Sequence, residues 1–109
     1  MARNFVQVGD TLTIPAPVAV SSGGVVIAGA IVGIAQGDAA QAAPVDVTTS
    51  GVWELSKVAA DAFTLGAPVY WDADDELATS TATDNTKLGV AVEAAPADTG
   101  SLKVRLSGF

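Results

Sequence analysis

Residues 23–35 read GGVVIAGAIVGIA, and this stretch decides the fold class. It is the most hydrophobic part of the chain, yet it is well short of the roughly 20 residues that a membrane-spanning helix needs. Two runs rich in β-branched residues, 25–27 (VVI) and 31–35 (IVGIA), lie on either side of Ala28-Gly29-Ala30. Such a pattern is typical of two buried strands joined by a turn. We therefore predict a β-hairpin here.

Short runs of the same kind recur along the chain, separated by turn residues. Pro15 and Pro17 interrupt the early part, because proline cannot donate to a strand ladder, and residues 36–43 have no strand period, which predicts a loop. One segment, residues 56–63 (SKVAADAF), predicts one or two turns of helix with Ser56 as the N-cap. The spacing favours an all-β fold, a small barrel or sandwich of short antiparallel strands with at most one short helix. Further strands are predicted over residues 4–8, 11–14, 45–49, 52–55, 69–72, 76–81, 87–93 and 101–106.

The two halves of the chain resemble each other. Residues 32–35 (VGIA) match residues 88–91 (LGVA), and residues 45–52 (VDVTTSGV) align with residues 102–109 (LKVRLSGF). The offset is nearly constant, 56 residues from 32 to 88 and 57 from 45 to 102. Short apolar strings also coincide by chance, so both coincidence and an internal duplication explain the match. A duplication predicts two similar β units related by pseudo-twofold symmetry.

The composition indicates one domain with few charges. The 109 residues suffice for a single core, so we expect one β domain over residues 1–109, with residues 1–5 as a flexible arm. Only 16% of the residues are charged, and the net charge is −7. An acidic chain repels nucleic-acid phosphates and anionic membranes, so neither is an expected partner. Because so little charge covers the surface, we expect part of it to be buried in a homo-oligomer or against another protein.

The residues of common active sites are missing. The chain has no cysteine and no histidine, and no glycine is followed by lysine as the phosphate-binding GxxxxGK[ST] motif requires. We therefore expect no enzyme activity, no catalytic residues, no metal and no cofactor.

Two acidic segments can each be interpreted either as a functional site or as an ordinary turn. Asp98-Thr99-Gly100 matches the triplet of aspartic proteases, but those enzymes place it after a buried apolar strand, whereas residues 94–97 here read AAPA. An ordinary loop turn also explains the triplet. Residues 72–76 (DADDE) could hold a weak surface cation through carboxylate oxygens, or form an acidic hairpin tip.

The few aromatic residues and the N-terminal arm are candidates for an interface. A strand over 69–72 places Val69 and Trp71 on one face and Tyr70 on the other, and bulky groups on both faces usually have both faces covered. One covering layer is the core, and the other is either core or a neighbouring subunit. The candidate interface residues are Arg3, Phe5, Trp53, Tyr70 and Trp71.

Seven landmarks lie along the chain: residues 4–10 (NFVQVGD), Ala16-Pro17, Ser22-Gly23-x-x-Val26, Gly33-Ile34-Ala35, residues 51–55 (GVWEL), residues 66–72 (GAPVYWD) and residues 88–92 (LGVAV). Together they resemble a family of small tailed-phage and prophage proteins. The family was long of unknown function, and some members carried an early label as RecA-like recombinases, which the missing phosphate loop argues against. The match covers almost the whole chain.

The resemblance implies a capsid cement or decoration protein that stabilises the phage head at junctions between capsid subunits. It implies the major capsid protein as a partner, a trimer by analogy with other head-decorating proteins, and a location on the virion surface after synthesis in the host cytoplasm. The arm with Arg3 and Phe5 is the segment that we expect against the capsid lattice, and an ordinary frayed terminus is the alternative interpretation. A carboxylate-only hydrolase and an unrelated prophage-encoded binding module are the alternatives.

Overall fold

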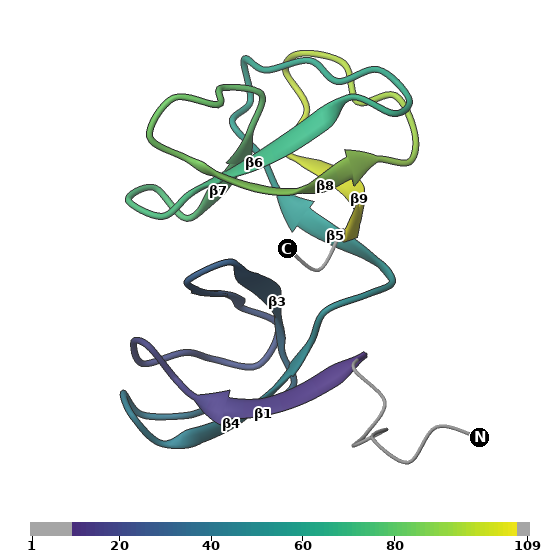
Figure 1. Cartoon of the computed structure of the whole chain (residues 1–109). Coiled ribbons are helices and arrows are strands. Elements are labelled where there is room, and N and C mark those ends of the chain that lie inside the picture. The colour runs from purple at the N-terminus through teal and green to yellow at the C-terminus, as the bar shows by residue number, and fades with distance from the viewer. Residues whose placement is uncertain (1–9, 107–109) are drawn as a thin grey trace, which may run out of the picture.

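Alternation of apolar and polar residues sets the strands, as residues 101–106 (SLKVRL) show, because every second side chain there is buried. The computed structural model describes residues 10–106, and within them it has nine strands and no helix (Figure 1). Residues 10–106 therefore contain no helix that could span a membrane. The strands are β1 (Thr11–Pro15), β2 (Val25–Ala28), β3 (Ile31–Ala35), β4 (Pro44–Thr48), β5 (Val52–Ser56), β6 (Pro68–Asp72), β7 (Leu77–Thr79), β8 (Thr86–Ala91) and β9 (Ser101–Leu106).

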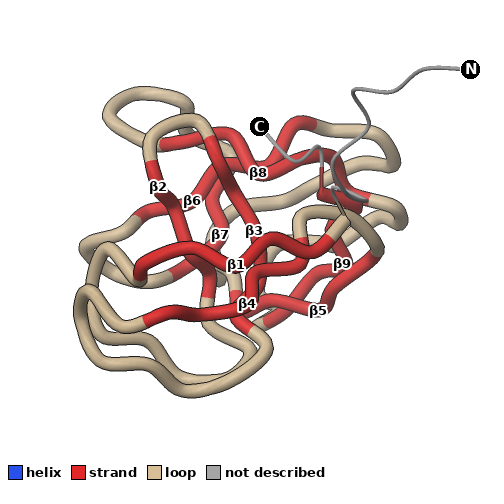
Figure 2. The backbone as a smooth tube through the Cα atoms, turned by 60° about the horizontal axis from the view of Figure 1, so that its bottom comes forward, coloured by secondary structure: helices blue, strands red, loops and turns tan. Residues whose placement is uncertain are grey.

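The strands form two antiparallel sheets. The first has the order β1-β4-β3-β2, and the second has the order β5-β9-β8-β6-β7. Figures 1 and 2 show the sheets as two stacked parts of the molecule. The edge strands of the second sheet, β5 and β7, meet near a parallel bridge between Lys57 and Ala78, but neither sheet is closed into a barrel. The all-β prediction is confirmed, and the arrangement is that of a sandwich.

The predicted hairpin in residues 23–35 is confirmed. β2 and β3 are neighbours, with Val26 opposite Gly33 and a turn at Gly29 and Ala30. Pro15, predicted to interrupt pairing, is instead the last residue of β1, where an edge strand tolerates a missing donor. The strand predicted over residues 4–8 lies outside the described residues.

The helix predicted over residues 56–63 is wrong. β5 runs to Ser56, and the N–H of Val58 then donates to the carbonyl of Ala78 in β7. The buried Lys57 ammonium donates to the carbonyls of Val58, Ala59 and Asp61. These partners hold the segment as an irregular turn, and eight residues are too few for a helix that lacks packing of its own.

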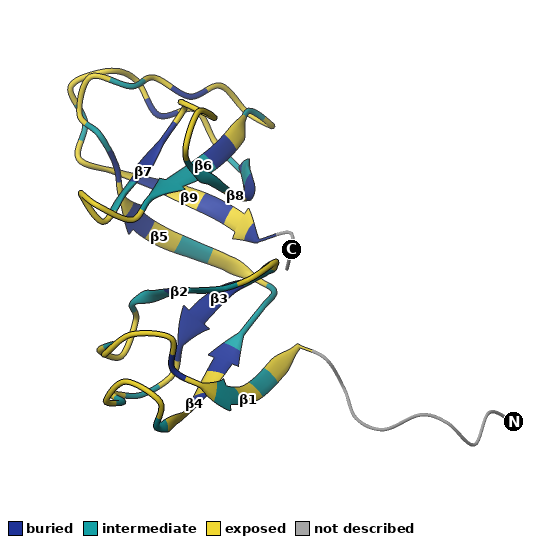
Figure 3. Cartoon of the chain, turned by 60° about the vertical axis from the view of Figure 1, so that its left-hand side comes forward, coloured by how far each residue is buried: buried dark blue, intermediate teal, exposed yellow. Residues whose placement is uncertain are grey.

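One apolar core joins the sheets. Val32 and Ile34 of β3 are buried in the same cluster as Val69, Leu88 and Val104 of the second sheet. Val25 and Ile27 of β2 and the two tryptophans pack against the margin of this cluster. A smaller cluster is formed by buried residues of the first half alone, among them Val26, Val45 and Val47. Figure 3 shows the buried residues on the inner strands of both sheets, with exposed residues at their margins. The sheets therefore bury apolar surface against each other.

The similarity between the two halves extends to strand register. The β3–β4 pair of the first half has the same register as the β8–β9 pair of the second, at the offsets of 56 and 57 residues seen in the sequence. The matching pairs are Ile34 with Thr48 and Ala35 with Val47 in the first half, and Val90 with Arg105 and Ala91 with Val104 in the second.

The hydrogen bonds outside the strands repeat as well. The N–H of Gly23 donates to the carbonyl of Ala35 at 2.8 Å, and that of Gly66 donates to the carbonyl of Ala91 at 2.7 Å. Both glycines adopt positive φ, 86° and 82°, a conformation that glycine takes without steric cost. The bridge between Val20 and Ala39 likewise matches the bridge between Phe63 and Ala95. The sequence repeat is therefore a structural repeat, and its pseudo-twofold symmetry stays a prediction.

The two halves of the chain differ clearly at one strand edge. β2 and β6 occupy equivalent places, since Val26 lies opposite Gly33 and Val69 lies opposite Gly89. On its other side β6 pairs with β7, whereas β2 is the last strand of its sheet. Within residues 10–106, the first half therefore has an open strand edge at the place where the second half has an additional strand.

Candidate functional site

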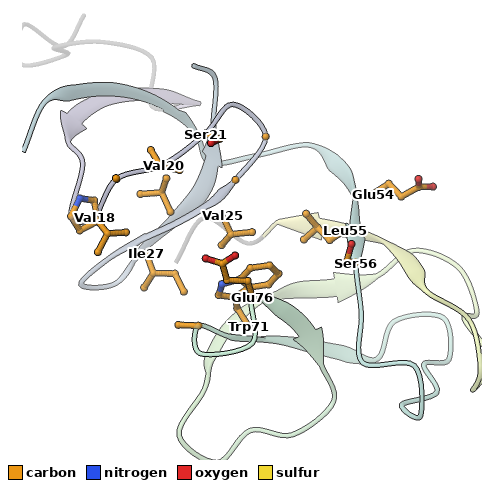
Figure 4. A pocket seen from close by; sticks show the side chains of 16 residues that line it. Val18, Val20, Ser21, Val25, Ile27, Glu54, Leu55, Ser56, Trp71 and Glu76 are labelled. Carbon is orange, nitrogen blue, oxygen red and sulfur yellow. The ribbon is translucent and has the colours of Figure 1, made fainter. Parts of the chain in front are cut away.

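A groove of about 570 Å³ runs along β2, at the place where the two halves meet. The loop before β2 forms one wall, and β5, β6 and the β6–β7 turn contribute the other (Figure 4). Figure 4 shows Val25 and Ile27 of β2 across from Trp71 and Glu76 of the second half. The groove is thus built from segments that lie far apart in the sequence.

The groove combines apolar walls with negative charge. Val18 at its rim is 62% exposed, and Val25, Ile27 and Trp71 are half-buried. Two exposed carboxylates, those of Glu54 and Glu76, also line it. No lysine or arginine is among the described residues that form its walls. Such a site suits an apolar segment that carries positive charge.

The structure brings only one of the candidate interface residues to this groove. Trp71 lines it, whereas Trp53 packs against the core and its indole N–H donates to the carbonyl of Ser50 at 2.9 Å. Tyr70 is half-buried on β6 and does not line the groove. Arg3 and Phe5 lie outside the described residues. Their role at an interface stays a prediction.

The acidic hairpin tip is organised by its own backbone. One carboxylate oxygen of Asp72 accepts hydrogen bonds from the N–H groups of Asp74 at 3.0 Å and Asp75 at 3.2 Å. This is the usual Asx-type stabilisation of a turn. Between residues 10 and 106, no three acidic side chains are grouped closely enough to hold a metal ion. The geometry favours the hairpin interpretation over the cation site.

The Asp98-Thr99-Gly100 triplet lies in a surface turn. Asp98 is exposed, has a φ of 68°, and donates its N–H to the carbonyl of Ala59 at 2.6 Å. The Thr99 hydroxyl donates to the carbonyl of Pro96 at 2.6 Å. A shared-proton dyad requires two carboxylates in a dry site, and an exposed turn does not provide one. The loop interpretation fits this geometry.

A polar cluster that the sequence did not reveal lies between β5 and β7. A carboxylate oxygen of Asp61 accepts a hydrogen bond from the buried Thr79 hydroxyl at 2.7 Å and one from the Ser80 N–H at 3.0 Å. These hydrogen bonds, with a smaller contribution from the Lys57 charge, hold the pKa of Asp61 below its ordinary value. The cluster fastens the turn after β5 to the end of β7.

The groove was not predicted from the sequence, although one signal for it was available. Aligning the halves through Gly23 and Gly66 would have shown that β7 has no counterpart after β2. The spacing of the groove residues in the sequence does not predict that they lie together. Examples are Val18, Glu54 and Glu76, which belong to separate loops and strands.

Comparison with known proteins gives one family. The family model described as phage cement protein matches residues 6–106, which is nearly the whole chain. No curated protein and no solved structure matches significantly.

Proposed function

The chain belongs to the phage cement protein family, and we propose that it reinforces the phage head by binding the major capsid protein at junctions between capsid subunits. Membership makes it a capsid cement or decoration protein associated with the virion. The family match over residues 6–106 is the observation that carries this assignment. The identity of the capsid partner and the position of binding are the proposed part.

The surface supports docking through uncharged contacts. Val18, Val52 and Leu65 are exposed by 62%, 54% and 73%, although they are large apolar side chains. Only 16% of the residues carry charge, against about 25% in an average soluble domain. Burying exposed apolar area against the capsid would supply the binding free energy, since each Å² removed from water contributes about 25 cal/mol.

We propose that the protein binds the capsid as a homo-oligomer, with a trimer favoured. Closed symmetric assemblies present the same surface several times, and this suits a lattice of repeated capsid subunits. Trp53, Tyr70 and Trp71, together with Arg3 and Phe5 of the arm, are the residues proposed for these interfaces. Synthesis places the protein in the host cytoplasm before it joins the head.

We propose no catalytic step for this protein. The family is structural, and the sequence offers neither histidine nor cysteine as a catalytic group. Purified protein should therefore lack peptidase and ATPase activity. Peptidase activity abolished by Asp98→Asn, a change that a left-handed turn position tolerates, would instead support the hydrolase alternative.

The test of capsid binding uses phage heads assembled without this protein. Added protein should co-sediment with the heads and saturate at a fixed number of copies per capsid subunit. Decorated heads should also release their DNA at a higher temperature than bare heads. Asp98→Asn serves as the matched control and should bind as the parent does. Absence of co-sedimentation, or binding without any gain in head stability, would contradict the proposal.

A further inference from the structure

The open edge of β2 is the starting point. In an antiparallel pair, every second residue of a strand turns its backbone N–H and C=O away from its neighbour. On β6 these outward groups pair with β7, as Tyr70 does with Thr79. Among the described residues, no backbone group pairs with β2 on its outer side. An open edge of this kind accepts an added strand.

The groove beside this edge restricts what can be added. Its wall before β2, residues 17–21, corresponds to residues 60–64 of the second half, where the Asp61 carboxylate accepts a hydrogen bond from Thr79 at the end of β7. The groove therefore occupies the place that β7 fills in the repeat. The groove is complementary to an extended segment that has apolar residues and a positive charge. Its apolar side chains are Val18, Ile27 and Trp71, and its carboxylates are those of Glu54 and Glu76.

We propose that the outer edge of β2 and this groove bind residues 1–8 of a second copy of the chain as an added β-strand. Residues 4–8 (NFVQV) alternate in polarity as a strand does. Arg3 is the only lysine or arginine before Lys57, and it complements Glu54 and Glu76. Phe5 supplies the apolar side chain that the wall around Val18 and Trp71 can cover.

The position of β1 favours binding of the arm to the groove of a second copy over binding to the groove of its own chain. The arm joins the fold at Thr11, the first residue of β1, and β1 and β2 are opposite edges of one sheet. Three strand spacings, about 14 Å, separate the two edges. A neighbouring molecule can bring its β2 edge to the arm without any crossing of the sheet.

This inference rests on the proposed self-association and not on capsid binding. On sequence grounds we expect the arm against the capsid lattice, but the groove offers a partner whose charge and polarity match those of the arm. The two destinations predict different contacts in solution, where no capsid is present.

Cross-linking between copies tests the contact directly, because the chain has no cysteine of its own. A tagged Phe5→Cys chain is mixed with an untagged Val18→Cys chain and treated with a short bismaleimide. We expect a mixed cross-linked dimer in high yield. The matched control is Leu65→Cys, which is 73% exposed and does not line the groove. Equal yields with Val18→Cys and Leu65→Cys would overturn the proposal.

A chain that carries both substitutions distinguishes an arm bound to a second copy from an arm bound to its own chain. If Phe5→Cys and Val18→Cys in the same chain cross-link internally at high dilution, while the mixed pair does not, the arm docks on its own chain and the proposal is wrong. If neither cross-link forms but heads are still bound through the arm, the capsid is the partner of the arm and the proposal is wrong. Head binding by the parent protein is measured in parallel, so a failure of the proposed function is seen separately.

Two further variants test the edge and the charge. Val25→Pro removes an outward N–H from β2, and Pro68 at the equivalent place in β6 shows that the strand accepts proline there. It should reduce the mixed cross-link about tenfold, as should Arg3→Glu. Glu76→Arg combined with Arg3→Glu should restore the yield, whereas Glu93→Arg, outside the groove, should not. An unchanged yield with Val25→Pro would exclude strand addition.

Discussion

At the scale of single residues, two glycines at equivalent places in the repeat allow neighbouring strands to approach closely. A Cβ atom on Gly33 would lie 2.6 Å from the carbonyl oxygen of Thr48, and one on Gly89 would lie 1.9 Å from that of Arg105. Both oxygens belong to backbone inside a sheet, so they cannot move without breaking the strand pairing. Position 33 and position 89 thus require glycine for the same reason.

Alanine at either glycine should therefore destabilise the protein strongly. We expect Gly33→Ala and Gly89→Ala each to lower the free energy of unfolding by more than about 2 kcal/mol, because an overpacked core must shift its backbone. Urea denaturation followed by tryptophan fluorescence measures this. Gly37→Ala is the control, since a Cβ there meets nothing within 4 Å, and it should change stability by less than about 0.5 kcal/mol. Equal effects at positions 37 and 89 would contradict the argument.

Asp61 should make stability depend on pH. Hydrogen bonds from Thr79 and Ser80 lower the pKa of its carboxyl in the folded state below the ordinary value of 3.8. The unfolded chain therefore binds this proton more tightly than the folded one, and protonation favours unfolding. The stabilising contribution is complete above the unfolded pKa and is lost as the pH falls through the folded pKa.

The measurement is the melting temperature of Asp61→Asn and of the parent between pH 7 and about pH 3. The parent should melt higher at pH 7, and the difference should shrink toward the acid end. Thr79→Val removes the largest cause of the lowered pKa and should reduce the pH dependence in the same way. A difference that stays constant over this range would show that Asp61 acts only through neutral contacts.

At the scale of elements, the segment after β5 depends on Lys57. Its ammonium donates to three carbonyls of the turn, those of Val58, Ala59 and Asp61, while the side chain is only 3% exposed. Lys57→Met keeps the apolar stem but removes this shared donor. The carbonyls of Val58 and Ala59 still accept from the N–H groups of Asp61 and Asp98, so the loss falls mainly on the carbonyl of Asp61. We expect the free energy of unfolding to fall by about 1–3 kcal/mol in denaturant titrations, the usual cost of leaving a buried polar group without its partner. Lys87→Met, at an exposed position, should have little effect.

The strand content of the described residues gives a second prediction at this scale. Far-UV circular dichroism should show mainly β structure with little helix, because residues 56–63 continue from a strand into a turn. A helix content near one third would contradict the fold. Lys57→Met should not raise the helical signal, since the N–H of Val58 remains paired with the carbonyl of Ala78.

At the scale of the whole molecule, the two sheets should unfold together. Val32 and Ile34 of the first sheet are buried in the cluster that holds the second sheet together. Scanning calorimetry at fixed protein concentration should therefore show one transition, with equal calorimetric and van't Hoff enthalpies. Gly33→Ala and Gly89→Ala should both lower that same transition. Two separate transitions, each moved by one of the variants, would mean that the halves are independent domains.

The local features of this protein can be predicted from its amino-acid sequence. The β-branched runs around Gly29 predict the β2–β3 hairpin, and the matching strings at residues 32 and 88 predict the repeat, because each of these patterns is a short run of consecutive residues. The landmarks from residue 4 to residue 92 resemble the cement family, and the family match over residues 6–106 shows that the chain belongs to it.

The features that depend on partners distant in the sequence became visible in the folded chain alone. Residues 56–63 have helical spacing, but the carbonyl of Ala78 and the burial of Lys57 fix them as a turn, since long-range pairing outweighs a weak local preference. The groove likewise joins Val18, Glu54 and Trp71, which no sequence period relates. Local patterns set which residues form strands, whereas the open edge of β2 follows from which strands become neighbours, and that is decided by packing over the whole chain.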